Sequence, residues 1–125
     1  MTSLARPRVL VAEDHPDVAK AVCRLLALEF EIVGSVADGS ALLEAVQRLE
    51  PDVVVLDLNL PGVHALEACR HLIRLNPAMK VVVFSAMSDP EVSEALVAAG
   101  ASAFVSKLAS AELPATIRRL CADPG

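Results

Sequence analysis

Five polar residues follow short apolar runs in this 125-residue chain, and together they could bind a cation and a negatively charged group. Glu13, Asp14 and Asp57 are carboxylic acids, Ser85 carries a hydroxyl and Lys107 an ammonium. Two carboxylates about 4 Å apart repel each other by roughly 4 kcal/mol at an effective dielectric near 20. A hard divalent cation with oxygen ligands relieves this repulsion. The lysine and the serine could then neutralise and hydrogen-bond further anionic oxygens.

The elements that must position these residues are predicted by an alternation of short apolar runs with longer segments of helical period. The runs are rich in β-branched residues and mostly lack polar alternation, which is typical of strands covered on both faces. Five strands are predicted: Val9 to Ala12, Glu31 to Val36, Val53 to Leu56, Val81 to Phe84 and Ala103 to Val105.

Helices are predicted between and after these strands, because apolar residues recur there at helical spacing. The recurring positions are Val18, Val22, Leu25 and Leu26; Leu42, Leu43 and Val46; Leu66, Cys69, Leu72 and Ile73; and Val92, Leu96 and Ala99. Asn76-Pro77 and Gly100 are the expected stops of the third and fourth helices.

A fifth helix should close the chain. Ser110 could cap it, but Pro114 suits a first turn, which places regular helix from Leu113.

Right-handed crossovers and short connections make an open, doubly wound α/β sheet the expected architecture. Such sheets bind ligands at the carboxyl ends of their strands, where the five polar residues fall. A single acid at such a position is usually only the point where the chain meets water. Five groups of complementary chemistry converging from four strands indicate a functional site.

The chain resembles the receiver domain of two-component response regulators over nearly its whole length. The resemblance rests on Glu13-Asp14 after Val9-Leu10-Val11-Ala12, on Val53-Val54-Val55-Leu56-Asp57-Leu58-Asn59-Leu60-Pro61-Gly62, on Val83-Phe84-Ser85-Ala86 and on Phe104-Val105-Ser106-Lys107. It implies a flavodoxin-like (βα)5 fold, with five parallel strands in the order 2-1-3-4-5. It also implies that Asp57 is the phosphoacceptor and that a sensor histidine kinase is the phosphodonor.

The resemblance assigns Mg²⁺ to the acidic residues as their cofactor. Asp14 and Asp57 would ligate the ion directly, Glu13 through water, and Asn59 through its main-chain carbonyl. Lys107 would neutralise charge on the phosphoryl oxygens. The domain would therefore be a phosphoacceptor that assists its own phosphorylation and dephosphorylation, and not a conventional enzyme.

Ser85 and Phe104 are the switch residues that the resemblance implies. The Ser85 hydroxyl would be drawn to the phosphoryl group, and Phe104 would turn into the space that it leaves. The alternative for Phe104 is an ordinary place in the core. The fourth helix, fifth strand and fifth helix would form the output surface.

Two positions depart from the family pattern. Ala65 stands where the family usually has glycine, which would cost about 1 kcal/mol if that turn needs a positive φ. Leu108 replaces the proline that commonly follows the lysine, so no cis peptide bond is expected there.

The segments Glu13-Asp14-His15-Pro16 and Asp57 to Gly62, with Lys107 lacking that proline, are similar to the subfamily with a LuxR-type DNA-binding output domain. Transcription would then be the output. The sequence ends shortly after Arg119, so we expect either a receiver cut from a longer regulator or a free-standing one.

Composition predicts a single soluble domain over residues 1–125, with a linker beginning at residues 122–125. The net charge of −5 and the scattered basic residues argue against direct nucleic-acid binding by this chain. No apolar run is long enough to cross a membrane, and the N-terminus has no signal-peptide pattern. Three cysteines without C-x-x-C spacing are typical of reduced thiols, which predicts a cytoplasmic location.

A homodimer is expected to use either the output surface or the first and fifth helices. In the first arrangement, Glu91 and Glu94 could pair with Arg118 and Arg119 across two subunits, although a run of charges is more often only solvated.

Three other functions remain open. A phosphatase of the haloacid dehalogenase type also places Asp-x-Asp after an apolar strand, but here the second position is Asn59, and an amide cannot act as general acid and base. A flavodoxin-like cofactor binder would need a phosphate-binding loop directly after the first strand. Residues 13–17 stand there instead, and their three acids would repel phosphate unless a cation intervenes. A receiver-shaped module that is never phosphorylated usually lacks an acid, the hydroxyl or the lysine; all are retained, but Ala65 and Leu108 keep this function open.

Overall fold

The computed structural model describes residues 6–86 and 89–122. Within them, five parallel strands form one sheet in the order β2-β1-β3-β4-β5, which confirms the predicted topology. The elements are β1 (Arg8–Ala12), α1 (Pro16–Ala27), β2 (Glu31–Val36), α2 (Gly39–Leu49), β3 (Val53–Asp57), α3 (Ala65–Leu75), β4 (Lys80–Ser85), α4 (Pro90–Ala98), β5 (Ala103–Ser106), the 3-10 helix η1 (Lys107–Glu112) and α5 (Leu113–Ala122).

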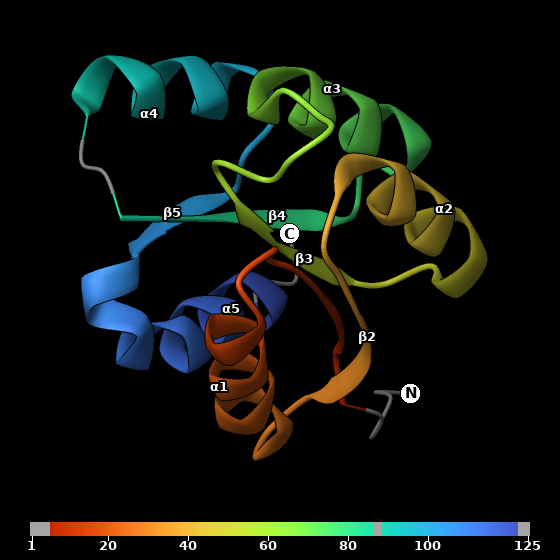
Figure 1. Cartoon of the computed structure of the whole chain (residues 1–125), viewed down its shortest axis with the longest axis vertical. Coiled ribbons are helices and arrows are strands. Elements are labelled where there is room, and N and C mark those ends of the chain that lie inside the picture. Colours follow the sequence, from red (N-terminus) through yellow and green to blue (C-terminus); the bar gives the residue numbers. More distant parts are fainter. Residues whose placement is uncertain (1–5, 87–88, 123–125) are drawn as a thin grey trace.

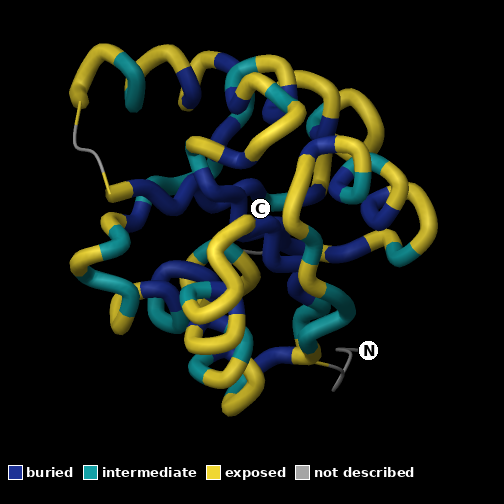
Figure 2. Tube along the Cα trace, in the orientation of Figure 1, coloured by how far each residue is buried: buried dark blue, intermediate teal, exposed yellow. Residues whose placement is uncertain are grey.

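Helices cover both faces of the sheet (Figure 1). Apolar residues of α2, α3 and α4 form one core with Val54 and Val83 of the sheet. Apolar residues of α1 and α5 form a second core with Val55 and Val82 on the opposite face. Figure 2 shows the buried residues in the centre of the molecule and the exposed ones along the outer sides of the helices. Burial on both faces explains why the strands lack polar alternation, and every residue of β3 is buried.

The alternation of side chains along each strand decides which face a strand-end residue occupies. Val53 and Val55 belong to the core beneath α1 and α5. Asp57 is two residues after Val55 in the same strand, so it lies on the same face. Phe84 of β4 belongs to the same core. Ser85 is two residues after Val83 and therefore lies on the opposite face, which α2, α3 and α4 cover.

Three strands extend one residue beyond their predicted carboxyl ends, through Asp57, Ser85 and Ser106. The apolar pattern stops earlier because the hydrogen bonds of a sheet join backbone groups and do not require an apolar side chain. Asp57 and Ser85 are therefore held by the sheet itself.

The helix boundaries largely agree with the predicted ones. α3 ends at Leu75, directly before Asn76-Pro77, and α5 begins at Leu113. The apolar pattern did not indicate the preceding η1 helix. α5 includes Ala122, so the predicted linker begins no earlier than residue 123, and residues 123–125 lie outside the described part of the chain.

Within the described residues, none of the helices combines the length and the apolar character that crossing a membrane requires. Cys23, Cys69 and Cys121 are free thiols. Burial raises the pKa of Cys69 to about 11, so this side chain stays protonated in the core.

Gly100 ends α4 in a conformation that other residues rarely adopt, with φ at 117°. Its N–H donates to the carbonyl of Val97 at 3.0 Å, and the N–H of Ala101 donates to that of Leu96 at 2.9 Å. These two bonds close the end of the helix. A Cβ added to Gly100 would lie 2.5 Å from Cγ1 of Ile73.

We expect Gly100→Ala to lower the free energy of unfolding by about 2 kcal/mol, because the alanine strains the backbone and overlaps Ile73. Gly34→Ala is the matched control: its Cβ would lie 3.3 Å from the side-chain ends of Leu10 and Leu49, so its loss should stay below about 1 kcal/mol. Urea denaturation measures both variants, and equal losses would contradict this assignment.

Candidate functional site

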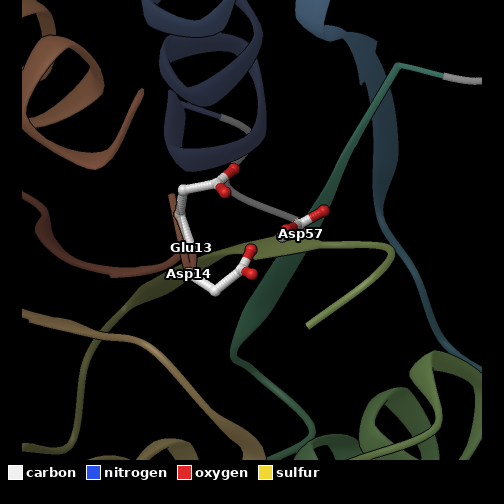
Figure 3. Close-up of side chains that lie close together, drawn as sticks. All are labelled: Glu13, Asp14 and Asp57. Carbon is white, nitrogen blue, oxygen red and sulfur yellow. The ribbon is translucent and has the colours of Figure 1, made fainter. Parts of the chain in front are cut away.

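Three carboxylates meet at the carboxyl edge of the sheet (Figure 3). Glu13 and Asp14 directly follow β1, and Asp57 is the last residue of β3, which pairs with β1. One oxygen from each carboxylate lies within 4.8 Å of the oxygens of the other two. The sheet therefore brings the three sequence-predicted acids together.

Two of these acids are buried. Glu13 and Asp57 each expose 3% of their surface, whereas Asp14 is exposed. Burial raises the pKa of Asp57 above its ordinary value, and the charge of Glu13 acts in the same direction. The backbone N–H of Asn59 and the charge of Lys107 oppose this shift without cancelling it. The ionised form of Asp57 is thus held where further positive charge would stabilise it.

The Lys107 ammonium contacts both buried acids. Its Nζ lies 2.7 Å from Oε1 of Glu13 and 3.3 Å from Oδ1 of Asp57. Burial lowers the pKa of Lys107, but the hydrogen bond to Glu13 and the two carboxylate charges outweigh burial and leave the pKa raised. The side chain is therefore an ammonium that is shared between the two acids.

Lys107 also has an aromatic neighbour that sequence reasoning missed. Nζ lies 5.7 Å from the centre of the Phe84 ring, within the range of a favourable cation–π interaction. The contact follows from the strand register, which pairs Phe84 with Asp57 and which the sequence pattern does not reveal.

Backbone N–H groups orient both buried carboxylates. The N–H of His15 donates to Oε2 of Glu13 at 3.0 Å, and the N–H of Asn59 donates to Oδ1 of Asp57 at 3.0 Å. Each donor lies two residues after its acid, as in the turns that acidic side chains form with their own main chain. The two buried carboxylates are therefore held both by local backbone N–H groups and by Lys107.

The residues present fit a hard divalent cation. Three carboxylates and one lysine leave two negative charges, which such an ion would balance. Mg²⁺ and Ca²⁺ prefer oxygen ligands, and each of the three acids in this cluster offers a carboxylate oxygen. Asp14 is exposed, so the cluster is open to solvent on one side.

Ser85 and Phe104 lie on the strands beyond Asp57. Ser85 is buried at the end of β4, one residue after the partner of Asp57. Phe104 of β5 pairs with Val83 and packs, partly buried, against the core beneath α2, α3 and α4. Its place in this structure is that of a core side chain, and its switch role stays a prediction.

Ala65 and Arg118 differ from their predicted environments. Ala65 is the first residue of α3, and the positive φ of the preceding loop belongs to Gly62, so the expected cost at Ala65 does not arise. Arg118 Nη1 lies 2.7 Å from Oε1 of Glu29 in the same chain. The predicted pairing of Arg118 and Arg119 with Glu91 and Glu94 between subunits stays a prediction.

Leu108 agrees with its prediction, because the described residues contain no cis peptide bond. Its backbone N–H donates to Oγ of Ser106 at 3.1 Å, a bond that a proline could not form. The residue is 93% exposed.

Comparison with known proteins agrees with this geometry. Residues 9–118 match the response regulator receiver domain family. The chain is 37% identical over 114 residues to the response regulator GacA of Pseudomonas viridiflava, which covers 89% of this chain and 53% of GacA. It is 35% identical over 102 residues to the transcriptional regulatory protein DegU of Brevibacillus brevis, which covers 80% of this chain and 43% of DegU. The chain thus spans about half the length of the curated relatives it matches.

Solved structures show the same fold. A LuxR-family two-component response regulator from Aurantimonas sp. SI85-9A1 superposes with a TM-score of 0.88 at 30% identity, covering 94% of this chain and 86% of that one. The signal receiver domain of NarL from Mycobacterium tuberculosis gives a TM-score of 0.85 at 28% identity, covering 97% of this chain and 99% of that domain. The LuxR-family neighbour agrees with the predicted subfamily. The chain belongs to the receiver-domain family of two-component response regulators.

Proposed function

We propose that this receiver domain accepts a phosphoryl group on Asp57 from the phosphohistidine of a sensor histidine kinase, in a reaction that needs Mg²⁺. The observation that carries the proposal is the cluster of Glu13, Asp14 and Asp57, with Lys107 in contact with both buried members. In this proposal the domain is the acceptor in the transfer, and its own residues assist the formation and hydrolysis of the acyl phosphate.

The Asp57 carboxylate is the nucleophile. One of its oxygens forms a bond to phosphorus while the bond from phosphorus to the donor nitrogen breaks, and the imidazole nitrogen keeps the electron pair. The N–H of Asn59 orients the carboxylate through Oδ1. Lys107 stands 3.3 Å from that oxygen and neutralises negative charge on the transferred phosphoryl oxygens.

Four residues would hold Mg²⁺: Asp14 and Asp57 through carboxylate oxygens, Asn59 through its main-chain carbonyl, and Glu13 through water. The water-mediated role of Glu13 is supported by its contacts, since Oε1 lies against Lys107 and Oε2 accepts the N–H of His15. When bound, the ion supplies positive charge that reduces the repulsion between the carboxylate and the phosphoryl oxygens.

The proposed switch consists of Ser85 and Phe104, and the proposed output surface consists of α4, β5 and α5. The Ser85 hydroxyl would donate to a phosphoryl oxygen, and Phe104 would turn towards the interior. In the whole protein we propose a DNA-binding domain of the LuxR type as the output, with transcription as the process controlled. The subfamily resemblance and the relation to the regulator DegU support this assignment.

The remaining parts of the proposal concern organisation and partners. Residues 1–125 would act as one receiver domain in the cytoplasm, as the free thiols suggest. A homodimer would form through α4, β5 and α5 or through α1 and α5. The receiver itself would not bind nucleic acid, which is consistent with its net charge of −5.

A receiver-shaped module that is never phosphorylated is the competing function. No observation in the described residues favours it, because the acids, the lysine and the buried serine all lie at the same edge of the sheet.

Incubation with a small phosphodonor and Mg²⁺ should add one phosphoryl group to the protein, and Asp57→Asn should abolish the addition because an amide is not a comparable nucleophile. Intact-mass spectrometry measures the adduct. Asp17→Asn is the matched control, since Asp17 is an exposed acid in the first turn of α1. We expect it to be labelled like the wild type.

Two outcomes of this experiment would contradict the proposal. An unlabelled wild-type protein would favour the module that is never phosphorylated. A labelled Asp57→Asn variant would show that another residue is the acceptor.

Mg²⁺ should stabilise the protein because it binds the folded carboxylate cluster, by about 2.7 kcal/mol at a hundredfold excess over its Kd. The melting temperature in Mg²⁺ and in EDTA measures this effect. Asp57→Asn should melt at or above the wild-type temperature in EDTA, because burial and Glu13 disfavour the ionised Asp57. It should gain less from Mg²⁺. Equal melting temperatures of the wild type in both solutions would argue against a shared cation site.

A further inference from the structure

The β3–α3 loop, residues 58–64, carries the Asn59 main chain that the proposed metal site uses. Its first residues are fixed to the sheet: the N–H of Leu58 donates to the carbonyl of Phe84 at 3.1 Å, and that of Leu60 to the carbonyl of Asp57 at 3.2 Å. The N–H of Asn59 donates to the Asp57 side chain. These bonds hold the loop at the end nearest the strand.

The middle of the same loop is held by a different element, α2. Gly39, the first residue of α2, donates its N–H to the carbonyl of Pro61 at 2.8 Å. A Cβ built on Gly39 would lie 2.4 Å from Cβ of Val63 and 2.9 Å from the carbonyl carbon and oxygen of Gly62. Two of these three contacts are with backbone, which cannot turn away as a side chain can. Only a glycine at position 39 permits this approach.

Gly62 completes the contact from the side of the loop. Its φ of 80° lies in the left-handed region, and the nitrogen of Gly39 lies 3.5 Å from the position of a Cβ on Gly62. The loop thus turns sharply where it meets the first residue of α2. Asp38, directly before Gly39, accepts the N–H of Ala41 through Oδ1 at 2.9 Å and fixes the start of the helix.

We propose that Gly39 is a positioning residue for the metal site: its contact with Pro61, Gly62 and Val63 sets the place of the β3–α3 loop and hence of the Asn59 main chain. The inference rests on the proposed function, since it assigns Asn59 to the metal. A side-chain ligand can be oriented by its own rotamer and hydrogen bonds. A main-chain ligand can be placed only by the anchors of its loop, and for this loop one anchor belongs to a helix that contributes no ligand.

The test compares Mg²⁺ affinity in Gly39→Ala and Gly100→Ala, with isothermal titration calorimetry of the full chain as the measurement. Gly39→Ala should weaken Mg²⁺ binding about tenfold, the lower end of the effect of losing an outer-shell contact. Gly100→Ala is the matched control, because its Cβ meets Ile73 at 2.5 Å but Gly100 lies before β5, at the opposite edge of the sheet. It should lose stability and keep the wild-type Kd.

A second measurement separates positioning from general destabilisation. In amide NMR spectra recorded without Mg²⁺, the Asn59 resonance should shift in Gly39→Ala and remain in place in Gly100→Ala. If Gly39→Ala does not fold, Gly62→Ala replaces it, because an alanine strains the loop at the same contact while meeting nothing closer than 3.5 Å. It should weaken Mg²⁺ binding in the same direction.

The outcomes distinguish the two proposals. A wild-type Kd in the folded Gly39→Ala variant, or equal losses of affinity in both glycine variants, would overturn the positioning role while leaving the proposed function intact. A wild-type protein that binds no Mg²⁺ would overturn the metal site and the positioning role together.

Discussion

The structure depends on a charge imbalance at one edge of the sheet. Glu13 and Asp57 are buried side by side, and Lys107 is shared between them at 2.7 and 3.3 Å. A buried charge is tolerated only when it is paired and hydrogen-bonded, and a single ammonium does not neutralise two acids. With Asp14 beside them, the acids keep an excess of negative charge that a divalent cation could balance.

The parallel sheet makes this crowding permanent. Glu13 directly follows β1 and Asp57 ends β3, and because these two strands are hydrogen-bonded neighbours, their pairing fixes the backbone of the two acids side by side. The N–H groups of His15 and Asn59 then orient each carboxylate from its own loop. The repulsion is offset by burial of the apolar strands, whose residues on both faces pack under helices. The stability of the core therefore allows like charges to be crowded at the edge of the sheet.

The open α/β sheet and the clustering of polar residues at its carboxyl edge could be predicted from the residues themselves, and the strand order 2-1-3-4-5 from the resemblance to the receiver family. The apolar runs report burial on both faces, and a parallel fold places their ends together. Contacts between side chains far apart in sequence could not be predicted. Examples are Phe84 beneath Lys107 and Arg118 with Glu29, which depend on register and on helix rotation. The role of Gly39 was also hidden, because nothing in the sequence shows that its Cβ position is occupied by another loop. At Ala65, a cost is expected only if the turn needs a positive φ there, and the structure has its positive φ at Gly62 instead.

The order of the elements along the chain determines when each part can form during synthesis. β1, β2 and β3 supply three adjacent strands and all three acids within residues 8–57. The apolar side of α1, with Val22 and Leu26, packs with Leu113 and Ile117 of the last helix. A ribosome that has not passed residue 107 therefore carries a nascent sheet whose acids lack their lysine and whose α1 core is open. Partly folded intermediates of this kind are prone to aggregation, and Lys107, Leu113 and Ile117 join the acids and the second core only after the chain has been synthesised through residue 117.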